Sequence, residues 1–322
     1  MYYPYLRGRQ NEMLCLRELL DAGKLSEKVT PIIEPVRFNS TFFSTLTKFI
    51  ENNRKIILIV NAKVGSFNQE YVEMKQKIET ETDESKKDKI KSLLDTYLEL
   101  LKDPHIQRAY IVDRRIVAEM VEGKKKAGDY VLINFENGNY QYYEEYTNLL
   151  EAKITLIPKD EDFKDEVGGD AVVLEDGLIK AKRNVDYIEA PDEFFSRNHV
   201  IYAKRGYIGF SDYSIVGNVY EESGFAPVAI AIHIVYFGNK EEVRVHHFVS
   251  ESNESISDPA RKFEEAMKNL MEWEQFEDIP KTMGLESLIE CYDQGKFPGL
   301  GVIKKYSLMH HIEMMGKYLE DK

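Results

Sequence analysis

One short run, KIILIVN at Lys55–Asn61, constrains the fold of this chain more than any other stretch. It is almost wholly apolar, so neither face of a strand formed by it can be left to water. Parallel sheets bury both faces of their strands because helices pack on each side. The run therefore predicts a strand of a parallel sheet in an α/β protein.

The same kind of run recurs through the first two-thirds of the chain. The other strand candidates are Tyr2–Arg7, Pro31–Val36, Gln107–Asp113, Tyr130–Glu136, Lys153–Lys159, Asp170–Glu175 and Tyr207–Asp212. Helical segments between them include Asn11–Ala22, Ile116–Lys126, Tyr142–Ala152 and, before the last strand, Pro191–Arg197. Eight strands in roughly 210 residues predict a (β/α)8, TIM-barrel-like fold, whose typical length is about 250 residues. An open doubly wound α/β sheet is the alternative, and it would leave two edge strands unpaired.

The barrel is expected to span residues 1–215, and a charged segment at 69–101 interrupts it. The segment contains the low-complexity piece ETETDESKKDK at Glu79–Lys89. Charge of this density on a helical pattern is typical of a solvated surface. We therefore predict a pair of helices that projects from the barrel with little burial.

Residues 216–322 have a different pattern. Val228–Phe237 and Val243–Ser250 flank a short Gly-Asn-Lys turn, which predicts a β-hairpin. Helical patterns follow at Pro259–Trp273, Leu285–Tyr292 and Ile303–Leu319. We predict that 216–322 forms a β-hairpin and helical cap that packs on the barrel as part of a single structural unit.

The charge balance limits the partners that the chain can have. Its 322 residues include 43 Lys and Arg against 56 Asp and Glu, a formal net charge of −13. So acidic a protein repels a phosphate backbone, and bulk nucleic-acid binding is not expected, although a local basic groove is allowed. No apolar run approaches the roughly 20 residues that span a bilayer, and the N-terminus lacks the apolar segment of a signal peptide. Cys15 and Cys291 lie in apolar helical patterns, which indicates reduced thiols in a cytoplasmic protein without a membrane partner.

Charged and amide side chains stand where the predicted barrel strands end, and functional groups of such barrels collect there. The candidate ligand-binding residues are Arg7, Arg9, Asn61, Lys63 and Lys159. The candidate catalytic residues are Glu34, Asp113, Glu136 and Asp212. The cations could hold a phosphate or carboxylate, and the carboxylates could transfer protons or bind a metal. The same ring is also consistent with a structural ion-pair network.

Other polar patterns are weaker signals. Neither a P-loop nor GxGxxG, HxH, DxD or HExxH is present, so no cofactor and no metal is predicted. Glu12, one turn into a helix, could pair with either arginine of the RGR turn. The stretch Asp212-Tyr213-Ser214 could form an Asx-type turn at the end of a strand.

Two pairs of adjacent histidines were considered as metal ligands or bases. His246 and His247 are neighbours in a strand and point to opposite faces, so they do not converge on one ion. His310 and His311 are about 100° apart around a helix, which also disfavours chelation. One histidine of each pair could act as a general base, and hydrogen-bonded structural histidines are the alternative.

Scattered motifs resemble those of the phage and bacterial "beta protein" family. They are Tyr3-Pro4, the Arg7-Gly8-Arg9 turn, Glu12, the strand Pro31–Glu34, the later GFSDYS stretch and His310-His311. The resemblance implies a component of a bacterial anti-phage defence or toxin–antitoxin-like module. It also implies a nuclease-like protein partner that is encoded nearby, and it supplies no catalytic assignment.

Two functions are therefore expected from the sequence. The first is that defence component, acting with a protein partner; an acidic surface with projecting charged helices suits a basic partner. The alternative is a TIM-barrel enzyme that acts on a phosphorylated or otherwise anionic small molecule or nucleotide. The residues leave open whether the chain is an enzyme.

Overall fold

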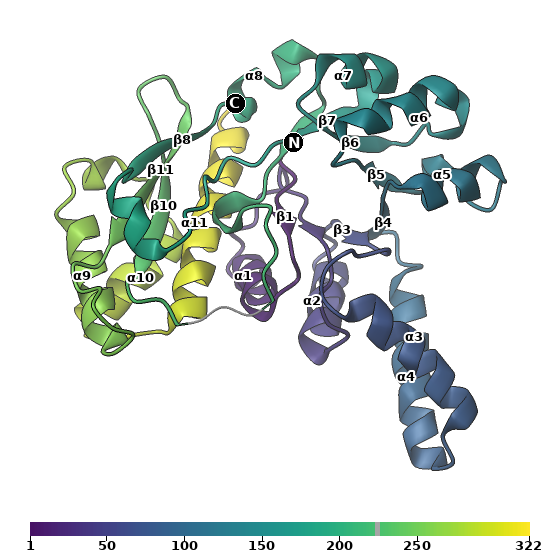
Figure 1. Ribbon diagram of the computed structural model, residues 1–322, viewed down its shortest axis with the longest axis horizontal. Coiled ribbons are helices and arrows are strands. Elements are labelled where there is room, and N and C mark those ends of the chain that lie inside the picture. The colour runs from purple at the N-terminus through teal and green to yellow at the C-terminus, as the bar shows by residue number, and fades with distance from the viewer. Residues whose placement is uncertain (223–225) are drawn as a thin grey trace. The chain divides into compact units, whose positions relative to one another are not determined.

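The computed structural model of the protein describes residues 1–222 and 226–322 (Figure 1). It contains two compact units, each built from segments that alternate along the chain. The barrel unit consists of Met1–Met13, Thr30–Glu175 and Tyr202–Ser211. The hairpin unit consists of Leu14–Val29, Asp176–Ile201 and Asp212–Lys322. Helix α1 (Gln10–Asp21) begins in the first unit and ends in the second.

The barrel unit contains an eight-stranded sheet in which every neighbouring pair is parallel. Its strands follow in chain order as β1 (Tyr5–Leu6), β2 (Ile32–Ile33), β3 (Ile56–Ile59), β4 (Ile106–Ile111), β5 (Val131–Ile133), β6 (Ile154–Pro158), β7 (Ala171–Leu174) and β9 (Gly209–Ser211). A parallel bridge between Tyr2 and Phe210 nearly closes the sheet, and the Tyr3 N–H donates to the Phe210 carbonyl at 2.9 Å. The predicted TIM-barrel-like fold is confirmed.

Apolar side chains on both faces of the strands explain why the sheet forms. All four residues of β3 are 0% exposed. Helix α2 (Ser40–Glu51) begins where the Asn39 side chain accepts from the Phe42 N–H at 3.0 Å, and it buries Phe42, Leu46 and Phe49. Complete burial stabilises such side chains by about 1.5–3 kcal/mol each. The remaining helices after the strands are α5 (Arg114–Val121), α6 (Tyr140–Glu145) and α7 (Glu161–Val167).

The charged segment forms two helices, α3 (Phe67–Thr80) and α4 (Glu84–Leu100), which extend away from the sheet (Figure 1). Only Phe67 of α3 and Leu94 and Tyr97 of α4 are buried. At the base of the pair, the Tyr97 ring lies 5.3 Å from Phe38 and 5.7 Å from Phe67, both edge-on. An aromatic cluster therefore holds the base, and the charged tips lie in solvent.

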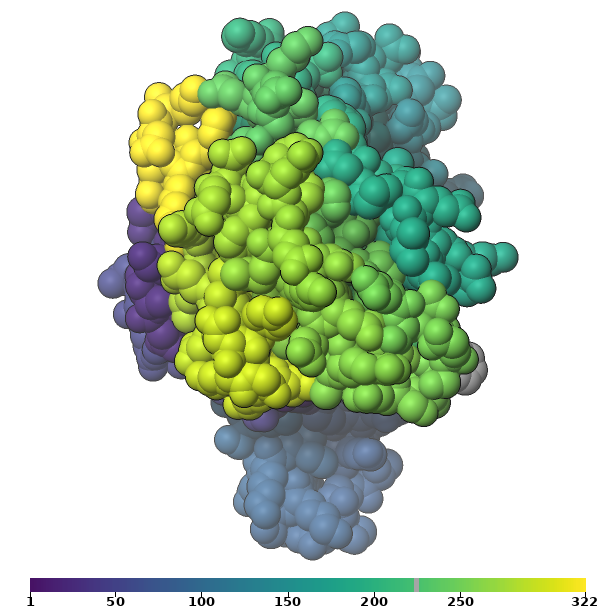
Figure 2. Space-filling view, turned by 90° about the vertical axis from the view of Figure 1, so that its left-hand side faces the viewer, coloured from purple at the N-terminus to yellow at the C-terminus, as the bar shows by residue number. Residues whose placement is uncertain are grey.

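The hairpin unit contains a three-stranded antiparallel sheet and the C-terminal helices. Its strands are β8 (Asp192–Ser196), β10 (Ala231–Phe237) and β11 (Val243–Val249), in the order β10-β11-β8. Helices α9 (Pro259–Met271), α10 (Met283–Asp293) and α11 (Leu300–Glu320) complete it. Figure 2 shows the face that carries α9 and α10. Throughout the described residues, no helix has both the length and the apolar content needed to cross a bilayer.

One predicted helix is wrong. Residues Pro191–Arg197 were expected to be helical, but Asp192–Ser196 is strand β8, paired with β11. Phe194 is 54% exposed whereas Phe195 is 2% exposed, as in a strand with one face to solvent. This pairing also groups residues 176–201, including helix α8 (Asn198–Ile201), with the hairpin unit, although they lie within the 1–215 range expected for the barrel.

Candidate functional site

Three cations of the predicted strand-end ring, Arg7, Lys63 and Lys159, are held in ion pairs. Glu34 is 1% exposed, and its carboxylate accepts from the Tyr5 hydroxyl and from the Lys63 backbone N–H, both at 2.7 Å. The Arg7 guanidinium pairs with the same carboxylate. The Arg7 backbone N–H donates to Glu12 at 2.6 Å, so the glutamate of helix α1 fixes the RGR turn. Glu34 is thus fully engaged by β1 and by the residues after β3.

The next strand ends are joined in a similar way. The Asn61 side chain donates to the Ile111 carbonyl and accepts from the Ile111 N–H, both at 2.8 Å, which ties the end of β3 to β4. Lys63 Nζ lies 2.5 Å from Asp113 Oδ2, and Asp113 Oδ1 caps helix α5 through the Ile116 N–H at 2.9 Å. Burial alone would raise the pKa of Asp113, but the Lys63 and cap hydrogen bonds hold that pKa below its usual value.

The remaining predicted site residues have different surroundings. Lys159 Nζ lies 3.1 Å from Glu175, and both side chains are partly exposed. Glu136 is exposed after β5, and Arg9 is partly exposed. Asp212 belongs to the hairpin unit, where it accepts from the Ser214 N–H at 2.8 Å in an Asx-type turn. The strand-end cations Arg7, Lys63 and Lys159 each hold a carboxylate of the barrel unit, as in the structural network considered above.

The histidines of α11 are structural. His310 Nε2 donates to the Val235 carbonyl and its Nδ1 accepts from the Thr282 hydroxyl, both at 2.7 Å. His311 Nδ1 lies 2.7 Å from the Ser214 hydroxyl. Burial lowers the pKa of His310 to about 4 and that of His311 to about 3, so both are neutral near pH 7.

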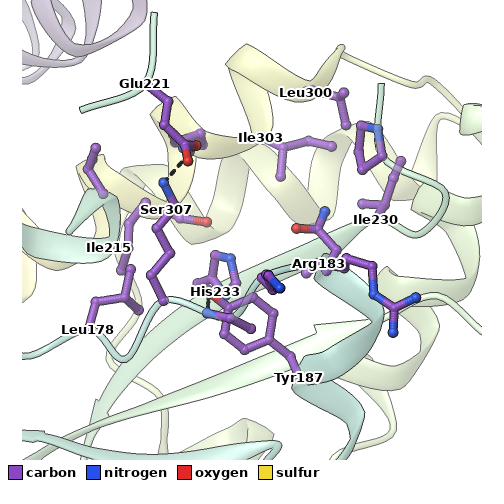
Figure 3. Close-up of a pocket in the computed structure, with 18 of the residues that line it drawn as sticks. Leu178, Arg183, Tyr187, Ile215, Glu221, Ile230, His233, Leu300, Ile303 and Ser307 are labelled. Atoms are coloured by element: carbon purple, nitrogen blue, oxygen red, sulfur yellow. Dashed lines mark hydrogen bonds and ion pairs between the residues drawn. The ribbon is translucent and has the colours of Figure 1, made fainter. Parts of the chain in front are cut away.

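A cavity of about 640 Å³ lies within the hairpin unit, outside all the residues that the sequence predicted (Figure 3). Tyr187 and His233 lie across it from Ile303 and Ser307 of α11. Apolar side chains form much of the wall, among them Leu178, Ile215, Ile230, Leu300 and Ile303.

Four exposed cations belong to the polar part of this lining, and they are Lys180, Lys182, Arg183 and Lys304. Two of them hold carboxylates, since Lys180 lies 2.9 Å from Glu221 and Arg183 lies 2.6 Å from Asp186. The four cations still outnumber these two carboxylates, in contrast with the net charge of −13 of the whole chain. The local potential therefore favours an anion.

Two histidines and a glutamate form a chain of contacts that ends in the cavity. His233 of β10 and His247 of β11 are paired across the hairpin, and their Nδ1 atoms lie 2.7 Å apart. His247 Nε2 lies 3.2 Å from Glu193 Oε2 of β8. The Tyr187 ring packs against both imidazoles, with centroid distances of 4.9 Å to His233 and 4.2 Å to His247. We name His233, His247 and Glu193 the histidine relay.

The adjacent histidine His246 lies on the other face of the sheet, as predicted. It contacts Asp192 at 3.3 Å and packs against Phe248 and Trp273. The relay itself was missed, although the hairpin motif contained its signal. His233 and His247 are equally distant along the chain from Lys240 in the turn, so a tight hairpin places them opposite each other.

Neither a metal nor a related protein explains the site. Within the described part of the chain, no group of three or more His, Cys, Asp and Glu side chains could hold a metal ion. Compared with protein-family models, curated proteins and solved structures, the chain matches none. The resemblance to the beta protein family therefore stays a prediction.

Proposed function

We propose that this protein binds a phosphorylated small molecule of nucleotide size in the cavity of the hairpin unit. The observation that carries the proposal is the placement of Lys182 and Lys304, beside the carboxylate-paired Lys180 and Arg183, around one cavity in an acidic chain. Lysine and arginine form charge-assisted hydrogen bonds with phosphate oxygens, which are stronger than neutral ones. This is the anionic-ligand function expected from the sequence, but at a different site.

The size and the wall of the cavity support the same ligand class. About 640 Å³ falls within the range of roughly 300–1,000 Å³ typical of small-molecule sites. The apolar wall formed by Ile215, Ile230 and Ile303 suits a flat apolar group such as a base, and the cations suit its phosphates. A ligand that contains a base and phosphates would contact both the apolar wall and the cations.

Binding is tested by isothermal titration calorimetry with AMP, ATP and inorganic pyrophosphate. A hydrogen bond to a charged group contributes about 1.5–3 kcal/mol, so Lys304→Ala should weaken binding at least about tenfold. Lys268→Ala is the matched control, because Lys268 is an exposed cation of the same unit on α9 that does not line the cavity. Absence of binding by the unaltered protein, or equal weakening by both substitutions, would contradict the proposal.

The second candidate is a component of a bacterial anti-phage defence or toxin–antitoxin-like module that acts in the cytoplasm with a protein partner. It is supported by the resemblance of Tyr3-Pro4, Arg7-Gly8-Arg9 and Pro31–Glu34 to beta protein motifs. The exposed, charged pair α3–α4 is a surface that such a partner could contact. Deletion of the gene in its native host should lower survival in a phage challenge, and affinity purification should recover the same partner repeatedly. Unchanged survival together with no recovered partner would refute this candidate.

A further inference from the structure

The contacts of the histidine relay determine where its protons lie. A glutamate carboxylate only accepts, so His247 Nε2 carries the proton in the 3.2 Å contact with Glu193. His247 is neutral near pH 7 because burial lowers its pKa, and its Nδ1 then holds a lone pair. The 2.7 Å contact between the two Nδ1 atoms therefore has the proton on His233 Nδ1.

This arrangement leaves a lone pair on Nε2 of His233. Among the described residues, no hydrogen bond reaches that atom. Because Nε2 is not among the fully buried polar atoms that lack a partner, it keeps some accessible surface. His233 lines the cavity (Figure 3), so Nε2 is the part of the relay that a bound molecule or water can reach. If His233 takes up a proton on Nε2, its Nδ1–H can still donate to His247, so the contacts with His247 and Glu193 hold the ring in one orientation.

We propose that His233 is a general base that activates water for hydrolysis of a phosphoester bound in this cavity, with His247 and Glu193 as positioning residues. The proposal rests on the anionic-ligand function above and extends it from binding to chemistry. It requires a base, an anion site and one cavity that contains both, and the hairpin unit brings these together.

The step balances with water as the co-reactant. His233 Nε2 accepts a proton from water while the water oxygen forms a bond to phosphorus. The bond between phosphorus and the leaving oxygen breaks, and that oxygen keeps the electron pair and takes a proton from solvent. His233 then returns its proton to solvent. Lys304 stabilises the charge that develops on the phosphoryl oxygens.

The surroundings of His233 keep it unprotonated near pH 7. The charged and titratable groups around it come from four elements, and they are His247 of β11, Glu193 of β8, Tyr187 of the short helix η5 (Asn184–Ile188) and Lys304 of α11. Burial, then His247, then Lys304 lower the pKa of His233 well below 6.5. The base is therefore deprotonated at neutral pH.

The first test measures hydrolysis of bis(p-nitrophenyl) phosphate and p-nitrophenyl phosphate by the full chain. His233→Asn keeps a donor near the Nδ1 position and removes the Nε2 base. We expect it to lower the rate at least about 100-fold, since general-base catalysis contributes roughly 10²–10⁴-fold. His246→Asn is the matched control on the opposite face of β11 and should leave the rate unchanged. His233→Gln is a second variant in case the first does not fold.

The second test examines the relay without turnover. In protein with ¹⁵N-labelled histidine, assigned by the His233→Asn variant, His233 should carry its proton on Nδ1 and show an unprotonated Nε2. Glu193→Gln should mix the two tautomers of His233 and lower the rate, because the carboxylate that holds the proton on His247 Nε2 is then missing. A purely structural role of Glu193 would change neither readout.

The outcomes separate this inference from the proposed binding function. No hydrolysis of either probe, or a His233→Asn variant as active as the unaltered protein, overturns the catalytic role, whatever calorimetry shows. Nucleotide binding together with no hydrolysis leaves the binding function in place. A proton on Nε2 of His233 in the labelled protein overturns the assignment of the base.

Discussion

The buried carboxylate of Glu34 provides a prediction whose size follows from its contacts. It accepts three hydrogen bonds, from the Tyr5 hydroxyl, the Lys63 backbone N–H and the Arg7 guanidinium. In Glu34→Gln the side chain keeps its shape but loses its charge, which leaves Arg7 charged at a position that is 7% exposed. Breaking one partner of a buried pair costs about 3–5 kcal/mol of the free energy of unfolding.

The matched control is Glu175→Gln, the same substitution at another strand end of the barrel unit. Glu175 pairs with Lys159, but their side chains are 33% and 40% exposed, so water compensates the lost charge. Exposed pairs contribute about 0.2–1 kcal/mol, and we expect a loss of that size. The double variant Arg7→Met with Glu34→Gln should recover most of the stability that Glu34→Gln alone loses, because it removes both charges of the pair.

The assay is urea unfolding followed by far-ultraviolet circular dichroism. Trp273 is the only tryptophan of the chain and belongs to the hairpin unit, so its fluorescence reports that unit separately. The Glu34 substitution should lower the free energy of unfolding several times more than the Glu175 substitution does. Equal losses for the two substitutions would refute the reasoning, and so would a double variant less stable than Glu34→Gln.

Three further predictions concern the strand-end lysines, the buried histidines and the helix pair. Lys63→Ala and Lys159→Ala should each lower the melting temperature by only a few degrees, since both pairs are partly exposed; loss of nucleotide binding in either variant would show that the ring is more than a structural network. Each of these histidines has a pKa of about 6.5 in the unfolded chain, whereas the folded values are about 4 for His310 and about 3 for His311. Their contribution to the free energy of unfolding is therefore complete above pH 6.5 and is lost as the pH falls toward the folded values. Urea unfolding followed by Trp273 fluorescence should therefore show a loss of about 2 kcal/mol for each histidine between pH 7.5 and 5, and a constant free energy over that interval would contradict the assignment. In hydrogen exchange the amides of α3 and α4 should exchange faster than those of β3, because few of their side chains are buried; equal protection would indicate packing against a partner.

The candidate cavity could not be predicted from the sequence, because its lining comes from separate segments of the chain. Lys180 and Arg183 follow the last residues of the barrel's seventh strand, His233 lies in the hairpin, and Lys304 lies on the last long helix. Of these residues, only His233 belongs to a predicted motif, the hairpin, and the charges of the others are ordinary for surface residues. Only the packing of the hairpin unit brings them to one cavity.

For the strand-end ring, the sequence predicted the residues but not their partners. The sequence correctly indicated polar residues at the ends of the barrel strands, and Arg7, Glu34, Lys63 and Asp113 do meet there. It did not determine whether a cation faces a ligand or a carboxylate, because that choice depends on side-chain distances of a few ångströms. The pairs Arg7–Glu34 and Lys63–Asp113 are set by neighbouring strands, which only the fold brings together.

The sequence by itself determined the parallel sheet, since strands that are apolar on both faces, such as Ile56–Ile59, need helices on both sides. Its near closure between Tyr2 and Phe210 was decided by the tertiary structure. The sequence also determined the hairpin, because a tight turn between two β-rich runs specifies its own pairing. Tertiary structure decided the rest. Residues Asp192–Ser196 became a strand because an edge of the hairpin was available to pair with them, and His233 became a relay end because His247 and Glu193 lay on the two neighbouring strands. Local patterns specify elements whose stability is local, whereas the identity of a side chain's partner depends on residues far away in the chain.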